Sequence, residues 1–305
     1  MKEWIITGAS GFVGQNLIPY LNNKGINTYT LGRSNADYQW SNLGSINNTI
    51  DAYIHLAGKA HDVRNTSGAD EYFSVNADLT IRLFEKFIES DAEVFIYMSS
   101  VKAAADTVEG VLTEDRSADP KTPYGQSKRK AEEYILKANL PEGKRAIILR
   151  PCMIHGPGNK GNLNLLYKFV VKGVPYPLAA FENKRSFLSI ANLNFVIASL
   201  IENKNISSGI YQVADDESLS TNELVELIAE CISKKPSLLK IPVSVMSALA
   251  KVGGVLKLPL NPDRLKKLTE SYLVSNDKLK GALNISAMPV SAKDGLRETI
   301  KSFNK

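Results

Sequence analysis

The sequence predicts an α/β protein in which a doubly wound parallel sheet is followed by a smaller α/β unit. Three observations predict this fold. Short apolar segments alternate with stretches of helical periodicity through the first half of the 305 residues. A glycine-rich turn joins the first apolar segment to the first helical stretch, and glycines and prolines become frequent after Arg150. Apolar strands separated by helices are typical of a parallel sheet that is covered on both faces.

Each element follows from its own pattern. Strands are predicted where short apolar segments rich in β-branched and aromatic residues occur, at residues 3–7, 27–31, 52–56, 94–98 and 145–149. Helices are predicted where apolar residues recur at spacings of three and four, at residues 12–23, 70–89 and 124–138. The stretch between Leu31 and Ala52 has no good helical pattern, so we expect one crossover to be degenerate.

The second unit is predicted to begin near residue 166, which divides the chain into 1–165 and 166–305. This boundary is approximate, and some interleaving of the two units is expected. A capping box, Ser220 to Glu223, opens a helix over residues 224–233. Residues 243–260 are the most apolar stretch, but they lack the roughly 18 unbroken apolar residues of a membrane-spanning helix. We expect a helix packed on the second unit there, with a membrane-surface helix as the alternative.

Composition excludes several classes of protein. Hydrophobic residues make up 44% and charged residues 23%, as in an ordinary globular chain. The formal charge is +5, but basic groupings such as Lys128-Arg129-Lys130 are short and are followed by acids, which favours an anionic small molecule over a nucleic acid as partner. Two distant cysteines and the lack of a signal peptide predict a reducing, cytoplasmic location. The three histidines lack zinc-ligand spacing, so no metal is expected.

A glycine loop with the spacing GxxGxxG follows the first strand and reads Gly8-Ala9-Ser10-Gly11-Phe12-Val13-Gly14. Gly8 permits a tight turn, Gly11 lets the backbone approach a pyrophosphate, and Gly14 lets the helix lie near the sheet. The helix that begins here offers unpaired N–H groups to phosphates. The loop therefore predicts a dinucleotide site; the alternative is an ordinary tight turn between strand and helix.

The end of the second strand carries information on which dinucleotide is bound. An acid there bonds the ribose 2′-hydroxyl of NAD, whereas an arginine suits the 2′-phosphate of NADP. This sequence places Gly32 at the acid position, followed by Arg33 and Ser34. We expect NADP(H), with Arg33 and Ser34 on the phosphate. NAD(H) stays open, with Asp37 or a backbone group on the ribose and Arg33 as a solvated charge.

Tyr124 and Lys128 form a YxxxK motif on a predicted helix, where residues four apart share a face. An ammonium beside the phenol would lower the Tyr124 pKa and let Tyr124 exchange a proton with a substrate oxygen. One unit earlier, a strand ends in Ser99-Ser100, at the edge of a parallel sheet where ligands bind. We expect Ser100, Tyr124 and Lys128 to be catalytic, with Tyr124 and Lys128 also contacting the cofactor; the alternative is a core tyrosine beside a surface lysine.

With these motifs the chain resembles the extended short-chain dehydrogenases/reductases of the NAD-dependent epimerase/dehydratase family. The resemblance covers nearly the whole chain and implies a Rossmann-type cofactor domain over 1–165 and a nucleotide-sugar-binding domain over 166–305. The segments that carry it are the glycine loop, His55-Leu56-Ala57-Gly58, Asn76, Ser99-Ser100, Tyr124 with Lys128, Arg150-Pro151, Gly156-Pro157-Gly158 and Lys184-Arg185-Ser186-Phe187.

The resemblance also implies roles for individual residues. The cofactor site would include Leu56, Ala57, Gly58, Asn76 and Pro151. Arg185 would grip the diphosphate of a nucleotide sugar, together with the helix start at Asn162. Lys102 is a candidate for substrate contact, with a surface lysine as the equal alternative. Many members dimerise through the helices that correspond to 76–89 and 124–138, so a homodimer is expected.

Departures from the family pattern narrow the reaction. Val101-Lys102 stand where sugar-nucleotide 4,6-dehydratases carry an acidic pair, so elimination of water is not expected. Ala103-Ala104-Ala105 replace the usual tyrosine of this segment, and Ser186 replaces the aspartate after the diphosphate arginine. Arg264 is a candidate for the family's second diphosphate arginine.

Three functions remain after these departures. The chain resembles bacterial UDP-sugar 4-ketoreductases and epimerase-like proteins of surface-polysaccharide synthesis. We therefore expect NADPH-dependent reduction of a UDP-4-keto-6-deoxy-N-acetylhexosamine. A UDP-sugar 4-epimerase with bound NAD is the alternative, and the pair Gly32-Arg33 argues against it because epimerases usually retain NAD. A non-catalytic dinucleotide-sensing protein would be expected to lack Tyr124 or Lys128.

Three further side chains have expected places. His55 ends a buried strand and is expected to be a packed histidine rather than a catalyst. His61 lies in the following loop and is a candidate for substrate contact. Cys152 is expected to be a small buried side chain, because no general base is placed beside it by the sequence.

Overall fold

Six strands from the first half of the chain and one from residues 209–213 form a seven-stranded parallel sheet. The computed structural model describes residues 2–59, 68–159, 161–256 and 260–303. The strand order is β10-β7-β5-β4-β1-β2-β3, with every neighbouring pair parallel. The predicted Rossmann-type fold is confirmed. The bounds of its strands are β1 (Glu3–Thr7), β2 (Asn27–Gly32), β3 (Tyr38–Gln39), β4 (Ala52–His55), β5 (Val94–Met98), β7 (Arg145–Pro151) and β10 (Gly209–Val213).

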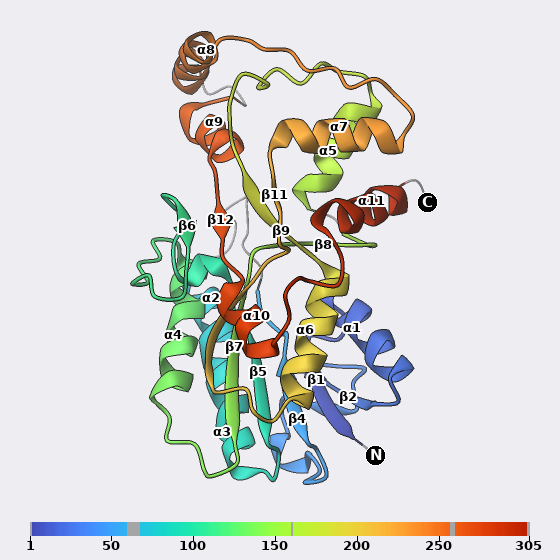
Figure 1. Cartoon of the computed structure of the whole chain (residues 1–305). Helices are drawn as coiled ribbons and strands as arrows, with labels where there is room; N and C mark the ends of the chain where they lie inside the picture. The colour runs from blue at the N-terminus through green and yellow to red at the C-terminus, as the bar shows by residue number, and fades with distance from the viewer. Residues whose placement is uncertain (1, 60–67, 160, 257–259, 304–305) are drawn as a thin grey trace.

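Helices cover both faces of this sheet, as Figure 1 shows. On one face, α1 (Phe12–Asn23) and α6 (Ile190–Glu202) bury Leu17 and Val196 against Ile6 of β1. On the other face, α3 (Leu79–Glu89) and α4 (Pro123–Lys137) form a second core cluster that contains Ile5 of β1. Successive strand residues point to opposite faces. A strand that is apolar on both sides therefore fits a sheet with helices on both faces.

Two predicted segments differ in detail from regular elements. The crossover from β2 to β4 contains only the short strand β3 and a 3₁₀ turn, η1 (Leu43–Ser45), as its missing periodicity indicated. The helix predicted over 70–89 is α2 (Ala69–Phe73) and α3 joined by a π-helical turn, η2 (Ser74–Asp78). The polar Asn76 lies in this turn and is fully buried. Apolar periodicity cannot reveal such a turn, because a buried asparagine and its partners cause it.

The second unit has its own core. Its three-stranded sheet has the order β11-β9-β8, and Figure 1 shows its helices gathered at the end of the molecule away from the large sheet. The capping box predicted at Ser220 is confirmed, since Ser220 and Glu223 bond each other's backbone N–H. The elements are β8 (Met153–His155), α5 (Asn162–Val171), β9 (Arg185–Ser189), β11 (Ser218–Leu219), α7 (Thr221–Cys231), α8 (Val243–Val255), α9 (Pro262–Thr269) and α11 (Ala292–Ser302).

The two units interleave along the chain. After β9, helix α6 and strand β10 return to the large sheet, where β10 pairs with β7. Helix α10 (Asp277–Leu283) also packs there, with Leu279 in the core on that face. In the opposite direction, β6 (Val111–Leu112) reaches out of the first half and pairs with β12 (Leu273–Val274). The division at residue 165 stays a prediction, and segments on both sides of it cross over.

A buried ion pair holds α4 on the sheet. Arg150 at the end of β7 donates to Glu132 of α4 from Nε at 2.8 Å and from a terminal nitrogen at 2.5 Å. Ser99, which follows β5, donates to the same carboxylate at 2.6 Å. Glu132 and Arg150 have side chains that are 0% and 1% exposed. Because the two charges satisfy each other bidentately, removing either one leaves an uncompensated charge in the interior.

Replacement of Glu132 by Gln is expected to destabilise the fold. The Arg150 charge would stay buried without its partner, which costs about 3–5 kcal/mol in the free energy of unfolding. The neighbouring Glu133→Gln is the matched control, because Glu133 makes a partly exposed pair with Arg129, and pairs of that kind contribute less than about 1 kcal/mol. Urea unfolding followed by circular dichroism measures both variants. Equal losses would contradict the role of the buried pair.

Candidate active site

The predicted site residues follow the carboxyl ends of neighbouring parallel strands. The glycine loop follows β1, Arg33 follows β2, Leu56 follows β4, Ser99 follows β5, and Pro151 ends β7. These ends lie along one edge of the sheet because all the strands run in the same direction. Ligands of open parallel sheets bind in the crevice at this edge. The architecture therefore gathers at one edge residues that are far apart in the sequence.

The glycine loop is packed so closely that side chains would not fit. Gly8 has a φ of 69°, and a Cβ there would lie 2.7 Å from the backbone nitrogen of Ala57. A Cβ at Gly14 would lie 2.5 Å from the carbonyl oxygen of Gly8. The Gly11 N–H bonds the same carbonyl at 2.9 Å and closes the turn. The loop thus depends on glycine for its left-handed turn and for contact with the loop after β4.

The start of α1 fits a phosphate group. Its N-cap, Gly11, makes no side-chain capping bond, and the first turn holds no acidic residue. The first N–H groups of a helix lack partners within the helix and carry partial positive charge. Ser10 and Gly11 are exposed at this point, and Phe12 and Val13 are partly buried beside it. The segment can therefore hold the pyrophosphate of a dinucleotide.

The loop after β2 contains one carboxylate that is hydrogen-bonded and one arginine that is not buried. One carboxylate oxygen of Asp37 accepts both the N–H and the hydroxyl of Thr30, at 2.7 and 2.8 Å. This closes the loop back onto β2. Arg33 and Ser34 lie exposed between these two residues. Asp37, the acid considered for an NAD ribose, is thus engaged in shaping the loop, while the arginine faces solvent.

Ser100, Tyr124 and Lys128 are brought together at the end of β5. Ser100 lies close enough to Tyr124 to lower the pKa of its phenol. Lys128 is buried, and its Nζ donates to the Met98 carbonyl at 2.8 Å. The Thr122 hydroxyl caps α4 by accepting the Gly125 N–H at 3.3 Å, which fixes the first turn that carries Tyr124. The arrangement presents a hydroxyl and a phenol to the same point.

The expectation that Lys128 lowers the Tyr124 pKa is not met. Burial raises the pKa of Tyr124, because a phenolate would lose its hydration, and Ser100 opposes this rise. Lys128 contributes no resolved effect, since its ammonium is directed to the Met98 carbonyl and lies over the Tyr97 ring, 5.0 Å from the centroid. Burial also lowers the pKa of Lys128 itself to about 8, although the negative charge of Glu132 acts to raise it.

A chain of buried hydrogen bonds links the glycine loop to Asn76 through His55. The Thr80 hydroxyl donates to the Asn76 carbonyl at 2.8 Å, so it accepts from His55 Nε2 at 2.9 Å. His55 Nδ1 then accepts from the Thr7 hydroxyl at 2.7 Å, and Thr7 accepts the Ala57 N–H at 2.9 Å. Burial lowers the pKa of His55 to about 3, which keeps the imidazole neutral. His55 is packed, as expected; His61 lies outside the described residues.

Asn76 fastens the loop after β4. Its Oδ1 accepts the Lys59 N–H at 2.7 Å, and its Nδ2 donates to Ser127 Oγ at 3.1 Å. A Cβ on Gly58 would lie 3.0 Å from both Asn76 Oδ1 and Lys128 Nζ. Gly58 therefore leaves the space in which these two polar groups meet. Gly58, one of the predicted cofactor residues, thus lies beside Lys128, which is predicted to be catalytic.

Lys102 and Arg185 lie within electrostatic reach of each other. Lys102 Nζ donates to the Asp106 carbonyl at 2.7 Å and lies 4.3 Å from the centroid of the Tyr272 ring. Burial lowers the pKa of Lys102, and Arg185 and Lys267 lower it further. This concentration of positive charge, opposed by Asp106 and Glu270, can attract an anion.

The Arg185 guanidinium donates two hydrogen bonds to backbone carbonyl groups. Its Nε donates to the Glu270 carbonyl at 3.1 Å, and a terminal nitrogen donates to the Lys267 carbonyl. Both acceptors lie at the carboxyl end of α9, where carbonyl groups lack helical partners. Arg185 therefore holds α9 against β9, a role that the sequence did not reveal.

The remaining predicted substrate residues occupy different positions. Asn162 begins α5 and is exposed, and the N-cap of this helix, Gly161, makes no side-chain bond. Ser186, at the family's aspartate position, is buried and accepts the Val274 N–H at 3.0 Å. Arg264 is exposed near the start of α9, where its N–H bonds the capping Asn261. Pro151 is buried in register with Val213 of β10.

Two functional contacts escaped sequence reasoning. Glu132 stands four residues after Lys128, just as Lys128 stands four residues after Tyr124. The same helical spacing could therefore have placed Glu132 on the face that Tyr124 and Lys128 share. Tyr272 donates to the Ala105 carbonyl at 2.7 Å and supports the 3₁₀ turn η3 (Val101–Ala103) after Ser100. No sequence signal indicates that contact, because the two residues belong to different units.

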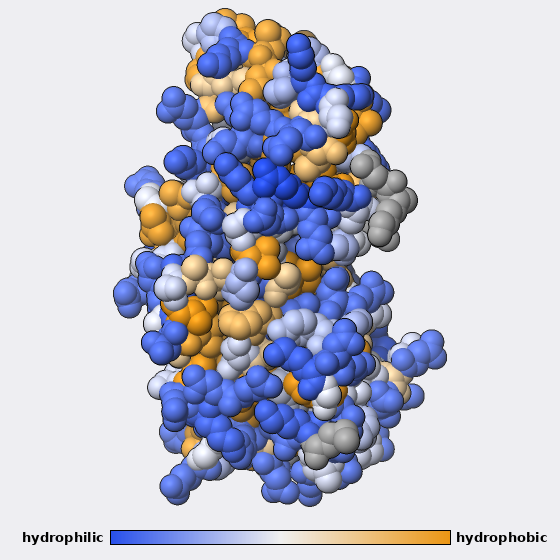
Figure 2. Space-filling view, turned by 45° about the vertical axis from the view of Figure 1, so that its right-hand side comes forward, coloured by the Kyte–Doolittle hydropathy of each residue, from blue (hydrophilic) through white to orange (hydrophobic). Residues whose placement is uncertain are grey.

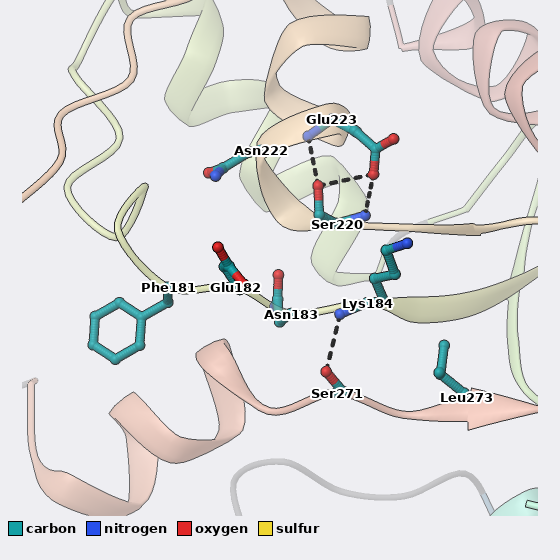
Figure 3. A pocket seen from close by; sticks show the side chains of 9 residues that line it. All are labelled: Phe181, Glu182, Asn183, Lys184, Ser220, Asn222, Glu223, Ser271 and Leu273. Carbon is teal, nitrogen blue, oxygen red and sulfur yellow. Dashed lines mark hydrogen bonds between the residues drawn. The ribbon is translucent and has the colours of Figure 1, made fainter. Parts of the chain in front are cut away.

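A cavity of about 520 Å³ opens in the second unit, at the base of β9 and the start of α7 (Figure 3). Its wall exposes more apolar than polar surface and includes the capping box of α7 and Lys184, next to Arg185. It is lined by Phe181, Glu182, Asn183, Lys184, Ser220, Asn222, Glu223, Ser271 and Leu273. Ser100, Tyr124 and Lys128, which are predicted to be catalytic, are not among these residues.

Comparison with known proteins identifies the class to which this fold and site belong. Residues 4–214 match the model of the NAD dependent epimerase/dehydratase family. The chain belongs to this family and is therefore an NAD(P)-dependent enzyme. It is 29% identical to UDP-glucose 4-epimerase of Vibrio cholerae, over 99% of this chain and 95% of that protein.

Two further comparisons show how widely the likeness extends. UDP-2-acetamido-2,6-β-L-arabino-hexul-4-ose reductase of Pseudomonas aeruginosa is 24% identical, over 77% of this chain and 59% of that protein. The solved structure of RMD from Pseudomonas aeruginosa complexed with NADPH has the same fold, with a TM-score of 0.74 and 20% identity over 99% of each chain. In the described residues, no helix has the length and apolar character needed to cross a membrane.

The lowered pKa of Lys128 predicts a dependence of stability on pH. The folded chain loses this proton near pH 8, whereas the unfolded chain keeps it to about 10.5. Between these values the unfolded state binds more protons, so the free energy of unfolding gains a contribution that grows as pH rises. Lys128→Met lacks this contribution. Urea unfolding across a pH series should show the difference between wild type and variant moving in favour of wild type through this window; a constant difference would contradict the assignment.

Proposed function

We propose that the chain reduces a UDP-linked 4-keto-6-deoxy-N-acetylhexosamine with NADPH. The end of β2 is the observation that carries this proposal. Gly32 offers no acid to a ribose 2′-hydroxyl, Asp37 is bonded to Thr30, and Arg33 with Ser34 is exposed. An arginine at this place suits a 2′-phosphate. A preference for NADP fits a reductase that exchanges its cofactor at each turnover.

The fit of the cofactor rests on features of the chain itself. The uncapped start of α1 and the glycine turn would hold the pyrophosphate. Lys128 and Asn76, which meet beside Gly58, would hold the nicotinamide ribose. When bound, the nicotinamide supplies a hydride to a carbonyl carbon. The protein's own task is then to hold that carbonyl and to deliver a proton to its oxygen.

Tyr124 is suited to deliver that proton. Its raised pKa keeps the phenol protonated at neutral pH, as a general acid requires. Ser100 lies close enough to Tyr124 to affect its pKa, so both hydroxyl groups would approach the oxygen at C4 of the sugar. The Ser100 hydroxyl orients this oxygen while the Tyr124 O–H bond breaks and a new O–H bond forms on the sugar. Lys128 holds the first turns of α4 to the end of β5.

The second unit would hold the nucleotide part of the substrate. Arg185 of β9 contributes positive charge from this unit, and Lys102 of the first unit, two residues after Ser100, lies within its electrostatic reach. A diphosphate is the anion expected there, and the open start of α5 at Asn162 provides a further anion-binding position. The relative that reduces a UDP-linked hexulose supports this class of substrate.

A UDP-sugar 4-epimerase is the second candidate, favoured by the relative from Vibrio cholerae that covers almost the entire chain. An epimerase uses the same Ser100 and Tyr124 but begins by removing a proton, for which the raised Tyr124 pKa is less suited. It must also keep its cofactor through both half reactions. The nucleotide retained by the purified protein therefore distinguishes the two functions: NAD at full occupancy supports the epimerase, and an empty site that NADPH fills supports the reductase.

The same proposal places the enzyme in the cytoplasm as a homodimer. Helices α3 and α4 lie side by side on one face of the sheet (Figure 1). Tyr134 and Leu136 of α4 are 38% and 48% exposed. They provide apolar surface for a second copy.

Replacement of Tyr124 by Phe tests the reaction. The variant lacks only the hydroxyl, so folding and cofactor binding should persist. Loss of general acid catalysis should lower the rate of NADPH oxidation by a UDP-4-keto sugar about 10²–10⁴-fold. Tyr134→Phe is the matched control, because Tyr134 lies on the same helix with its hydroxyl bonded to the exposed Glu85. Stopped-flow spectroscopy at saturating substrate measures the rate of NADPH oxidation in both variants. Hydride transfer at the wild-type rate in Tyr124→Phe would contradict the role of Tyr124 as the acid.

Replacement of Arg33 by Ala tests the cofactor. A charge-assisted bond contributes roughly 1.5–3 kcal/mol, so the dissociation constant of NADPH should rise about tenfold or more. The constant for NADH should hardly change. Arg297→Ala, at a partly exposed arginine of α11 that pairs with Glu230, serves as the control for a general loss of positive charge. Fluorescence titration measures both cofactors; equal losses for NADPH and NADH would show that Arg33 does not contact the 2′-phosphate.

A further inference from the structure

Helix α8 leaves a continuous apolar surface exposed. Its buried residues form a narrow stripe of Met246, Ala250 and Gly253. The parallel stripe of Val245, Leu249 and Val252 is 46%, 52% and 55% exposed. A helix that is apolar on most of its circumference is normally buried or in contact with lipid. The structure buries only the smaller part of this one.

The exposed surface extends beyond the helix at both ends. Val255 and Leu256 at its carboxyl end are 83% and 62% exposed, and Leu239 and Val243 at its start are 48% and 45% exposed. Figure 1 shows α8 at the end of the molecule farthest from the large sheet, and Figure 2 shows hydrophobic surface at that end. Nothing in the described part of the chain covers this surface. This apolar surface is therefore accessible to a binding partner at the end of the second unit.

Basic residues surround the apolar surface. Among the described residues of 239–270, Asp263 and Glu270 are the acids. Against them stand five exposed cations, Lys240, Lys251, Arg264, Lys266 and Lys267. Lys251 lies on the same sector of α8 as Ser244 and Ser247, away from the exposed apolar stripe, by the helical spacing of 100° per residue. An apolar sector beside a polar sector that carries a cation, with further cations on the neighbouring α9, fits a helix that lies at a membrane surface.

We propose that α8, with the basic residues of α9, docks on the surface of an anionic lipid bilayer. Val245, Leu249 and Val252 enter the boundary between headgroups and acyl chains, and the surrounding cations pair with anionic headgroups. Charge decides between this occupant and a second copy of the chain. Two copies meeting through this surface would bring both sets of cations together, whereas an anionic bilayer neutralises them.

The docking surface is connected to the predicted substrate site. Gly254 of α8 packs against Pro262 at the start of α9, since a Cβ there would lie 3.2 Å from the Pro262 ring. The other end of α9 accepts the hydrogen bonds of Arg185. A bilayer that holds α8 would therefore hold the element to which Arg185 is bonded. The docking proposal itself stands whether or not the proposed reductase activity is correct.

Sedimentation with vesicles tests the proposal. The full-length protein is mixed with vesicles of phosphatidylcholine alone or of phosphatidylcholine and phosphatidylglycerol at a ratio of about three to one. We expect the fraction that sediments to be at least about tenfold larger with the anionic vesicles and to fall in high salt. No sedimentation with anionic vesicles would overturn the proposal.

Matched variants separate the apolar and the basic contributions. The double variant Leu249→Ser/Val252→Ser should lower vesicle binding at least about tenfold, because it removes the residues that enter the bilayer. Leu165→Ser/Val174→Ser alters exposed apolar residues on and after α5 and should bind like wild type. Lys251→Gln/Lys266→Gln should weaken binding to anionic vesicles alone. Circular dichroism and thermal unfolding confirm that each variant is folded.

Two outcomes favour a different occupant and would overturn the proposal. Equal vesicle binding by Leu249→Ser/Val252→Ser and wild type would show that α8 is not the contact. Light scattering that finds a wild-type dimer which this double variant converts to monomer, with no binding of wild type to vesicles, would assign the surface to a second copy of the chain.

Discussion

The buried pair of Glu132 and Arg150 fixes the helix on which the candidate chemistry depends. Tyr124, Lys128 and Glu132 stand at successive four-residue spacings on α4, so they share one face of that helix. The pair anchors this face to β7, and Ser99 ties the same carboxylate to the end of β5. Lys128 then reaches the Met98 carbonyl at that strand end. Two charges inside a protein are stable only when each satisfies the other, so rotation of α4 would expose both to an apolar interior. The position of Tyr124 therefore follows from an ion pair two turns away.

The polar side chains at the ends of β1 and β4 are neutral and hydrogen-bonded. His55 is neutral and bonds a threonine at each ring nitrogen, and Asn76 satisfies the backbone of the loop after β4. These bonds connect the strand ends of β1 and β4 to the π-helical turn η2. A rigid network of satisfied groups costs nothing in unpaired hydrogen bonds and holds the backbone that would line a dinucleotide. Lys128 is the exception, since burial lowers its pKa to about 8.

The sequence predicted the sheet, its flanking helices and the glycine loop because each depends on local pattern. Residues 94–98 are apolar throughout, residues 4–6 form the apolar centre of the first strand, and Gly8 must turn where no side chain fits. It also located Ser100, Tyr124 and Lys128 at one edge, since parallel strands put their carboxyl ends together. What it could not predict depends on contacts between distant segments. The π-helical turn follows from the bonds of Asn76 to Lys59 and Ser127. The raised pKa of Tyr124 follows from burial, which outweighs a neighbouring lysine whose charge is engaged elsewhere. The spacing of apolar residues along the chain indicates neither the π-helical turn nor the raised pKa of Tyr124.

Arg185 connects β9 to α9 in a similar way, through contacts between distant segments. Its bonds to the carboxyl end of α9 satisfy carbonyl groups that no helical N–H can reach. A diphosphate carries full negative charge and competes for the same guanidinium more strongly than carbonyl dipoles do. Binding of a nucleotide diphosphate at this arginine would therefore weaken the hold on α9, whose other end packs against α8. Since Lys102 lies within the electrostatic reach of Arg185 and two residues from Ser100, one anion between them would affect the catalytic cluster and the exposed helix at the same time.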